Sequence, residues 1–287
     1  SSDPNNGTLD LDGEYVTYTP NDNFIGLDSF KYRVLDEFST SDEGTVTVRV
    51  THKIYSTPKE IFTTYGDNEG DFLGGGFTAY GSELNTSSDG KIITVSSIKG
   101  YGDAGYVKVY KKGDDNEWSQ LGPTIKGNEN SELMWFGNNT VTSSDGLTIG
   151  SGGWRADNNK GWYKVYKFNG EDWVQKGNTI KGSEQAKSWF GFQSSMSADG
   201  NIVAIGEDGY SNSNFGRVTV YKFLNDKWVQ LGKEIVGQVT NGYLGADVEI
   251  SRNGNVLAVG EFSTSKSSVY VYELEYGDWV NKKTLTR

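Results

Sequence analysis

The 287-residue sequence contains no cysteine, one histidine, two methionines and four prolines. The absence of cysteine excludes disulfides, thiolate nucleophiles and cysteine-based zinc sites. A Ser-His-Asp triad would depend on His52, and the sequence holds no convincing nucleophile motif to pair with it. No apolar run approaches the roughly 18 residues of a membrane span, and no basic, apolar leader begins at Ser1. We therefore expect a mature or excised stretch of chain that does not insert into a membrane.

Positive charge is also scarce, with 27 lysines and arginines against 38 aspartates and glutamates and a net charge of −11. Nucleic acids and anionic membranes bind clustered Lys and Arg, so neither is an expected partner. The acidic residues show no distinguishing pair that points to glycoside hydrolysis. The glycine clusters at 74–76 and 150–153 lack the Lys-Ser/Thr pair and the helix of a phosphate-binding loop. The sequence predicts a protein that is not an enzyme.

The sequence contains an internal repeat of about 50 residues. Tryptophan recurs at spacings of 55, 55 and 51 residues, at Trp118, Trp173, Trp228 and Trp279. A Val-Tyr pair precedes each tryptophan, at 109–110, 165–166, 220–221 and 271–272. Each unit also has an upstream turn signal, at Asp89-Gly90, Asp145-Gly146, Asp199-Gly200 and Asn253-Gly254, and a glycine before it, at Gly81, Gly137, Gly191 and Gly245. Four markers in constant order define four equivalent units.

The third unit indicates what each repeat builds. Asp199-Gly200 predicts a type I′ turn, whose twist suits two antiparallel strands. Residues 217–221 alternate strictly between polar and apolar, as a half-buried third strand does, and 227–231 supply a fourth strand. Four antiparallel strands in a unit of this length are typical of a propeller blade. No segment has a 3.6-residue apolar stripe, so we expect almost no helix.

The predicted fold class is therefore all-β, with a partial immunoglobulin-like sandwich followed by four four-stranded β-propeller blades. The predicted boundaries are residues 1–50 for the sandwich, 51–65 for a linker and 66–287 for the blades, divided into 66–127, 128–182, 183–237 and 238–287. The four blades either close a small ring or form an arc of a larger one. The recurring tryptophans are interpreted as packing between sheets, and so are Trp135 and Trp189 beside the repeat glycines.

The repeats resemble the bacterial and algal extracellular repeats related to the FG-GAP propellers of integrin heads. The resemblance covers roughly Gly66 to Arg287 and rests on five stretches of the third unit: 189–191 (WFG), 197–200 (SADG), 204–206 (AIG), 216–221 (GRVTVY) and 228–232 (WVQLG). Calcium-binding FG-GAP blades carry an Asp-x-Asp-x-Asp-Gly loop, whereas Ser-x-Asp-Gly supplies a single carboxylate here. Since calcium takes about six or more oxygens, we interpret these Asp-Gly positions as turns.

Residues 7–50 follow a different pattern, which resembles the C-terminal half of the cadherin-like and immunoglobulin-like modules of large bacterial adhesins. The resemblance rests on Tyr18-Thr19-Pro20, Asn23-Phe24, Gly26, Asp28-Ser29-Phe30 and Tyr32-Arg33-Val34. The opening strands of such a module are missing, so we expect a sheet with open edges. Either the chain continues upstream, or a strand from another chain fills the gap. Pro58 ends the linker that follows.

Calcium is the one cofactor that the resemblance leaves open, because cadherin-like domains often bind calcium where modules meet. The candidate ligands lie near the loops of the first module: Asp28, Asp36, Glu37 and Asp42. The alternative interpretation is that these are solvated turn acids. The sequence does not indicate whether the sequons at Asn6, Asn85 and Asn138 are glycosylated.

Three functions are compatible with this architecture. The first is a non-enzymatic adhesion or protein-interaction module of a larger extracellular or cell-surface protein. The second is a structural subunit of an extracellular filament, appendage or virion, with copies of the chain as partners. The third is a carbohydrate-binding, lectin-like propeller. Propeller repeats usually serve as binding platforms, although this argument rests on the architecture alone.

The least uniform part of each repeat predicts where a ligand binds. It is the loop between the second and third strands, at 97–104, 151–160, 207–215 and 261–267, and the common strand order places all four loops on one face. Trp and Arg are frequent at interaction hot spots, so Trp154 and Arg155 are the first candidates, with Tyr101 and Tyr210 in support. The alternative is that these side chains pack locally over the blade edges.

Overall fold

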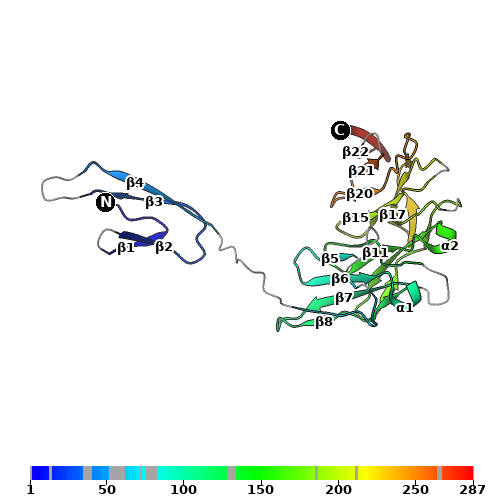
Figure 1. The fold of residues 1–287 in the computed structure, drawn as a ribbon, viewed down its shortest axis with the longest axis horizontal. Coiled ribbons are helices and arrows are strands. Elements are labelled where there is room, and N and C mark those ends of the chain that lie inside the picture. The colour runs from blue at the N-terminus through cyan, green and yellow to red at the C-terminus, as the bar shows by residue number, and fades with distance from the viewer. Residues whose placement is uncertain are drawn as a thin grey trace. The chain divides into compact units, whose positions relative to one another are not determined.

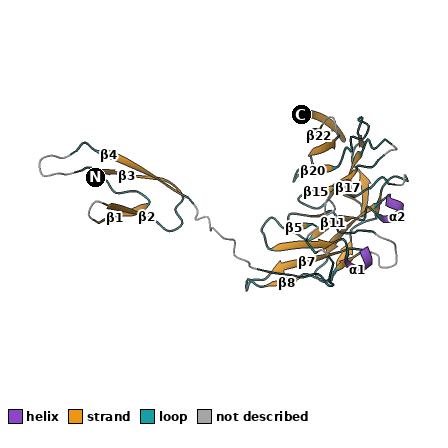
Figure 2. Ribbon diagram, viewed as in Figure 1, coloured by secondary structure: helices purple, strands orange, loops and turns teal. Residues whose placement is uncertain are grey.

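A computed structural model describes residues 2–12, 15–34, 41–51, 62–71, 73–74, 83–127, 134–184, 187–210, 213–263 and 267–286. The chain forms two units, Ser1–Ile61 and Phe62–Arg287. Both are built from antiparallel sheets (Figure 1). The described helices are two four-residue turns, α1 (Gly100–Asp103) and α2 (Ala156–Asn159), each interrupted by left-handed residues (Figure 2). The described structure is therefore all-β with almost no helix, as the sequence predicted.

The first unit consists of two antiparallel pairs. Strand β1 (Gly7–Asp12) pairs with β2 (Tyr15–Pro20), and β3 (Gly26–Tyr32) pairs with β4 (Gly44–Val50). Inward and outward positions alternate along β4, since successive side chains of a strand point to opposite faces. Phe30 on β3 is the buried hydrophobic residue of this unit among those described.

Asp28 on β3 is buried and fastens the N-terminal segment to this sheet. Its carboxylate accepts hydrogen bonds of 2.7–3.1 Å from the backbone N–H groups of Asn5, Asn6 and Ser29 and from the hydroxyl of Tyr18. Burial opposes ionisation of Asp28, but these hydrogen bonds outweigh it and lower the pKa of the carboxyl.

The prediction of a calcium site gains no support from these residues. The carboxylate of Asp28 is occupied by hydrogen-bond donors, and Asp42 is exposed. Asp36 and Glu37 lie outside the described residues. Asp28 therefore acts as a structural hydrogen-bond acceptor, and calcium binding by this module stays a prediction.

The second unit contains four consecutive sheets, which we call blades 1 to 4. Blade 1 comprises β5 (Leu84–Thr86), β6 (Ile92–Ser97), β7 (Tyr106–Lys112), β8 (Trp118–Gln120) and β9 (Ile125–Lys126). Blade 2 comprises β10 (Thr140–Thr142), β11 (Thr148–Gly152), β12 (Trp162–Phe168), β13 (Trp173–Gln175) and β14 (Ile180–Lys181). Blade 3 comprises β15 (Ser194–Met196), β16 (Ile202–Glu207), β17 (Arg217–Leu224), β18 (Lys227–Gln230) and β19 (Ile235–Val236). Blade 4 comprises β20 (Asp247–Ile250), β21 (Val256–Phe262), β22 (Ser267–Glu275) and β23 (Asp278–Thr286).

Every blade has the strand order first, second, third, fourth. In blades 1 to 3 the outer edge is split, because the fourth strand and a further two-residue strand (β9, β14 or β19) pair in succession with the third strand. In blade 4 the single strand β23 covers the whole length of β22, with a bulge between Val271 and Tyr272. The outer edge of blade 4, the last described blade, is therefore one continuous strand, unlike the split edges of blades 1 to 3.

The turn between the first and second strands differs from the predicted type I′ turn. Only its glycine is left-handed, with φ of +68° at Gly90, +71° at Gly146, +66° at Gly200 and +73° at Gly254. The preceding Asp caps the loop instead: Asp89 Oδ1 accepts hydrogen bonds from Ser87 Oγ (2.6 Å) and Lys91 N (3.0 Å). The carboxylate of the Ser-x-Asp-Gly motif is thus used within its own turn, an Asx-type arrangement.

These turns lie side by side and form a ladder along the array. Ser88 N donates to Ser144 O, Ser144 N to Ala198 O, and Ala198 N to Arg252 O, each at 2.8 Å. The side chain of Arg252 in blade 4 also donates to the hydroxyls of Ser88 (3.1 Å) and Ser144 (3.0 Å). One short ladder therefore links all four blades.

The recurring tryptophans fasten each blade to the one before it, as their spacing predicted. The indole N–H of Trp173 donates to Leu121 O (2.8 Å), that of Trp228 to Lys176 O (2.7 Å) and that of Trp279 to Leu231 O (2.9 Å). Trp118, in the first blade, instead stacks on Phe62, with ring centroids 5.6 Å apart. The second unit therefore begins at Phe62, inside the predicted linker.

Glycine permits this close approach of neighbouring sheets. A Cβ atom on Gly152 would lie 2.1 Å from the carbonyl oxygen of Gly191 in the next blade, and one on Gly206 would lie 2.2 Å from that of Gly245. In the first blade the equivalent position is Ser96, whose Cβ would lie 3.0 Å from a Cβ on Gly137 in the next blade and whose carbonyl oxygen accepts a hydrogen bond from Gly74 N (2.9 Å). Gly81, the glycine that the repeat spacing favoured there, lies outside the described residues.

The last blade leaves one side uncovered. Val218 in blade 3 is fully buried by blade 4, but the equivalent Val269 is 41% exposed. Likewise Ile235 is 9% exposed, whereas Leu285 is 53% exposed. The described blades therefore form an arc with a free side on blade 4.

Glycine substitutions test the packing between blades. Gly177 (φ +76°) and Gly170 (φ +108°) are both left-handed, but a Cβ on Gly177 would lie 2.9 Å from Trp228 Cδ1, whereas nothing lies within 4 Å of one on Gly170. We predict that Gly170→Ala costs about 1 kcal/mol through its backbone conformation, and that Gly177→Ala costs about 1–3 kcal/mol more through crowding. Urea denaturation measures both. Equal losses of stability in the two variants would contradict the close packing of Gly177 against Trp228.

Candidate functional site

Trp154 and Arg155 lie where β11 of blade 2 gives way to α2. Trp154 is buried and Arg155 is half-buried. The loop between them and β12 contains three consecutive left-handed residues, Asp157, Asn158 and Asn159. Asp and Asn adopt this conformation more readily than other side chains do, which explains how the sequence forms this tight loop.

Two further tryptophans close around Trp154. Trp135 and Trp189 each precede the Phe-Gly pair of a blade and have left-handed backbones, with φ of +54° and +57°. A bulky residue in this region is an outlier that its surroundings must hold in place. The ring of Trp154 meets Trp135 and Trp189 edge to face, with centroids 5.4 and 6.4 Å apart. The sequence analysis assigned both tryptophans to packing, whereas they also line a cavity.

This outer cavity has a volume of about 260 Å³ and is lined by Trp135, Trp154, Arg155, Asn159, Lys187 and Trp189. The guanidinium carbon of Arg155 lies 4.1 Å from the ring centroid of Trp135 and 5.2 Å from that of Trp154. Lys99 Nζ from blade 1 lies 5.1 Å from the Trp135 ring. Indole faces and cationic groups therefore share one opening, which suits an acidic or planar polar group of a ligand.

A smaller inner cavity of about 110 Å³ lies on the same tryptophans. Its lining is Trp154, Trp189, Phe192 and Asp208. Asp208 follows β16 at the repeat position that Trp154 occupies in blade 2, and it is only 8% exposed. Burial, together with the nearby charge of Glu207, raises the pKa of Asp208 to about 7. Its Oδ1 atom has no hydrogen-bond partner among the described residues.

The other two predicted site residues lie elsewhere. Tyr101 donates its hydroxyl hydrogen to Asp67 (2.9 Å), and Lys126 Nζ lies 3.9 Å from its ring centroid. Tyr210 is covered by Arg217, whose guanidinium carbon lies 4.2 Å from the ring centroid. Both tyrosines are therefore held by charged neighbours, and neither lines the cavities around Trp154.

Sequence reasoning missed Asn159, Lys187, Phe192 and Asp208. Their common signal is the repeat itself, since the residues before and after the Phe-Gly pair and those after the second strand recur in each blade. Aligning the sequences of the blades would have shown that Asp208 and Trp154 occupy the same repeat position. It would not have shown that these side chains meet across a blade boundary.

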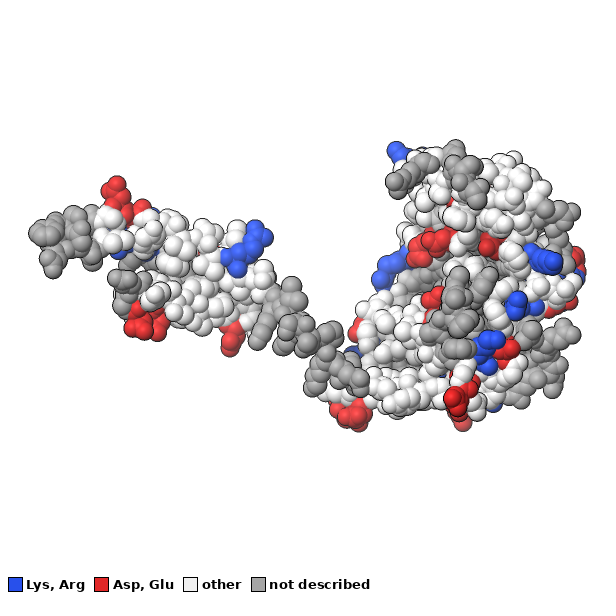
Figure 3. All heavy atoms as spheres, in the orientation of Figure 1, with Lys and Arg blue, Asp and Glu red and all other residues white. Residues whose placement is uncertain are grey.

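Charge is dispersed over one face of the second unit. Acidic and basic side chains are intermixed on the face of residues 62–287 that Figure 3 shows. Among the residues that the structure describes, no group of three or more His, Asp or Glu side chains is placed to hold a metal ion. None of the described helices has the length and apolar character needed to span a membrane.

Residues 1–49 match the family model of the bacterial Ig domain. No protein with a curated description matches the sequence. Among solved structures, the chain is similar to hydrazine synthase from Kuenenia stuttgartiensis (14% identity, 71% of this chain and 48% of that chain, TM-score 0.47) and to TolB from Agrobacterium tumefaciens (12%, 70% and 60%, 0.42). TolB from Acinetobacter baumannii is also similar (13%, 69% and 42%, 0.41). The chain spans less than two thirds of the length of each of these proteins.

The buried carboxyl of Asp208 predicts a pH-dependent stability. The folded protein keeps this proton up to about pH 7, whereas an unfolded chain loses it near the ordinary aspartate pKa of about 4. The folded state binds more protons in this window, so stability falls as pH rises, by up to about 4 kcal/mol. Asp208→Asn removes this contribution. Denaturation of both proteins from pH 4 to 8 tests it, and a constant difference between them would contradict the buried carboxyl.

Proposed function

We propose that this chain is a non-enzymatic protein-interaction module of a larger extracellular or cell-surface protein, and that a partner binds at the outer cavity around Trp154 and Arg155. The observation that supports the proposal is the meeting of three indoles and cationic side chains at one opening. Tryptophan and arginine dominate interaction hot spots because they offer large contact areas and directed hydrogen bonds. Loops on a rigid scaffold commonly carry such residues.

The chemistry of the cavity indicates the kind of partner. Arg155 and Lys187 favour an acidic side chain, and the half-buried ring of Trp189 offers a flat apolar surface beside them. An extended segment that combines Asp or Glu with an aromatic or apolar residue would use both. The resemblance of the repeats to extracellular FG-GAP propellers and the bacterial Ig match at 1–49 are consistent with a module of an adhesin.

A displayed library of random peptides tests this proposal. We predict that peptides selected on the whole chain are enriched in acidic and aromatic residues and that Arg155→Ala weakens their binding at least about tenfold, as expected for a charged hot-spot contact. Tyr276→Ala is the matched control, because this side chain is fully exposed and lies outside the cavity. Melting temperatures of both variants check that the fold is intact.

Equal binding to wild type and Arg155→Ala would contradict the proposal. A glycan array run in parallel examines the lectin-like alternative. Binding of sugars that is lost in Trp189→Ala and kept in Arg155→Ala would place a carbohydrate, not an acidic segment, on the indole faces.

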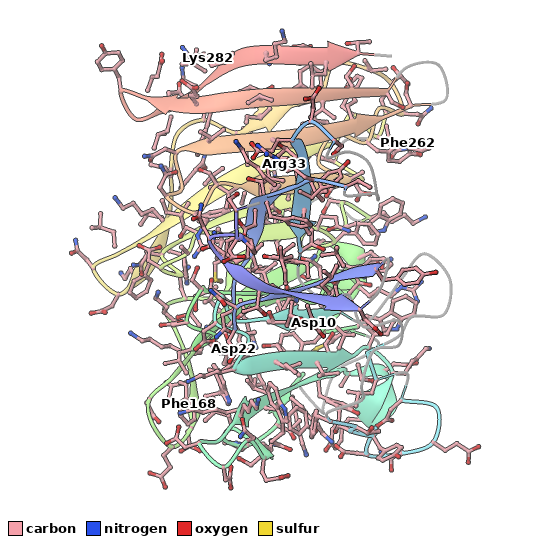
Figure 4. The ribbon with its side chains drawn as sticks, turned by 90° about the vertical axis from the view of Figure 1, so that its left-hand side faces the viewer. Asp10, Asp22, Arg33, Phe168, Phe262 and Lys282 are labelled. Carbon is pink, nitrogen blue, oxygen red and sulfur yellow. The ribbon has the colours of Figure 1, made fainter. Side chains whose placement is uncertain are left out.

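The free side of blade 4 favours a second candidate function, a structural subunit whose copies associate. A cavity of about 570 Å³ opens there, lined by Gly260, Phe262, Val269, Leu285 and their neighbours. Figure 4 labels Phe262 at the end of β21 and Lys282 on β23. In the other blades this side receives another copy of the repeat. We propose that the outer edge of blade 1 of a second chain covers it here, because residues 62–71 already contact Tyr106, Lys108 and Tyr110 of their own blade 1. Its exposed β7–β8 hairpin carries Asp114, Asp115 and Glu117, opposite in charge to Lys282 and Lys283.

Sedimentation velocity over a range of concentrations tests this candidate. We predict association that Val269→Asp abolishes, because it places a charge on the free side of blade 4. Val174→Asp is the matched control, since Val174 is a similarly exposed valine on the outer strand of blade 2. A monomer at all concentrations would exclude the assembly.

A further inference from the structure

The inner cavity combines an acidic group with aromatic side chains in a small space. Asp208 is more than nine-tenths buried, and its Oδ1 atom has no hydrogen-bond partner among the described residues. A buried polar atom of this kind is costly unless something satisfies it. Three rings share the cavity with it, those of Trp154, Trp189 and Phe192. The outer cavity shares Trp154 and Trp189 with it, but its charged lining residues are the cations Arg155 and Lys187.

We infer that the inner cavity is a binding site for an organic cation, of the alkylammonium class. The rings of Trp154 and Phe192 meet at 88° with centroids 5.5 Å apart, and those of Trp154 and Trp189 meet at 84°. Rings at right angles form the walls of a box. An ammonium group in such a box is attracted by the negative faces of the rings and by a carboxylate. The volume of about 110 Å³ suits the head group of a small alkylammonium ion.

The local charges determine when Asp208 is available to the cation. Glu207, the neighbouring residue on the strand, forms a buried ion pair with Arg217, so its carboxylate already has a cationic partner. Arg155 and Lys187 belong to the outer cavity. The pKa of Asp208 is raised to about 7, mainly by burial. A cation prefers the ionised carboxylate, so its affinity rises as pH increases through neutrality and binding releases a proton.

This inference is independent of the proposed partner interaction. The outer cavity depends on Arg155, whereas the inner cavity depends on Asp208. A loss of peptide binding in Arg155→Ala with unchanged cation binding would leave the inner site intact, and the converse holds for Asp208→Asn.

Choline and its uncharged analogue 3,3-dimethyl-1-butanol test the inference, because they have nearly the same shape and differ in charge. Titration calorimetry on the whole chain at pH 8 measures the affinity for each of the two ligands, and tryptophan fluorescence provides a second readout. We predict that choline binds at least about tenfold more tightly than the alcohol, which corresponds to a desolvated cation–π and ion-pair contribution of more than 1 kcal/mol. Choline binding weakens at pH 6.

Two variants assign the effect to the site. Asp208→Asn keeps the shape and removes the charge, so choline then binds no better than the alcohol, and the pH dependence disappears. Trp189→Leu removes one aromatic wall of the cavity and weakens the binding of choline. Tyr276→Ala, on the exposed β22–β23 turn, leaves the affinity for choline unchanged. Equal affinity of wild type for choline and the alcohol, no binding of choline at all, or unchanged choline binding in Asp208→Asn would each overturn the inference. The wild-type comparison of the two ligands decides even if a variant fails to fold.

Discussion

The close approach of neighbouring blades is the constraint on which the rest of the second unit depends. At the boundary between blades 2 and 3 the backbone of Gly152 lies against that of Gly191, and no side chain fits between them. The indole of Trp228 completes the same boundary from the outer edge by donating to Lys176 O. Burial of apolar side chains between sheets supplies the main stabilisation, and glycine allows the sheets to come together.

The candidate site is a consequence of this constraint. Phe190 is buried between blades and Gly191 is fixed against Gly152, so the residue before them has little freedom. That residue is Trp189, which is held in a left-handed conformation. Trp135 stands in the same position one blade earlier, and Trp154 lies between the two. The strained backbone of two tryptophans is thus maintained by the packing beneath them, and it brings three indoles to one place.

The two cavities around Trp154 differ in electrostatic character because their polar residues come from different blades. Arg155 and Asn159 belong to the loop of blade 2, whereas Asp208 follows the second strand of blade 3. Trp154 and Asp208 occupy the same repeat position. This position of the scaffold therefore carries an aromatic side chain in blade 2 and an acidic one in blade 3. A change at this repeat position therefore alters the lining of a cavity without disturbing the sheets.

Much of the fold could be predicted from the sequence, because the repeat reports on local structure. Trp173 and Trp228 lie on the fourth strands of successive sheets, as the repeat indicated, and the alternation of residues 217–221 located a third strand. The type I′ turn was wrong because the Asp of Ser-x-Asp-Gly caps its own loop instead of adopting a left-handed conformation. The pattern of small, polar and acidic residues does not distinguish these two turns.

The site was only partly predictable, for a physical reason. Trp154 and Arg155 were identified because large side chains in a loop are unusual. Their neighbours Trp189 and Asp208 come from the next blade, far along the chain, and the contacts depend on how blades pack. Tyr101 was singled out by the same argument as Trp154, yet its hydroxyl donates to Asp67, in the segment that precedes blade 1. A single sequence does not separate these outcomes.

Native-state hydrogen exchange measured by mass spectrometry tests the central claim, that packing between blades holds each sheet in place. The third strands β12 (Trp162–Phe168) and β17 (Arg217–Leu224) are covered on both sides, whereas one side of β22 (Ser267–Glu275) is free. At dilute concentration we predict that amides of β22 exchange at least about tenfold faster than those of β12 and β17, because a sheet with one free side opens at lower cost. Equal protection of the three strands would contradict the account.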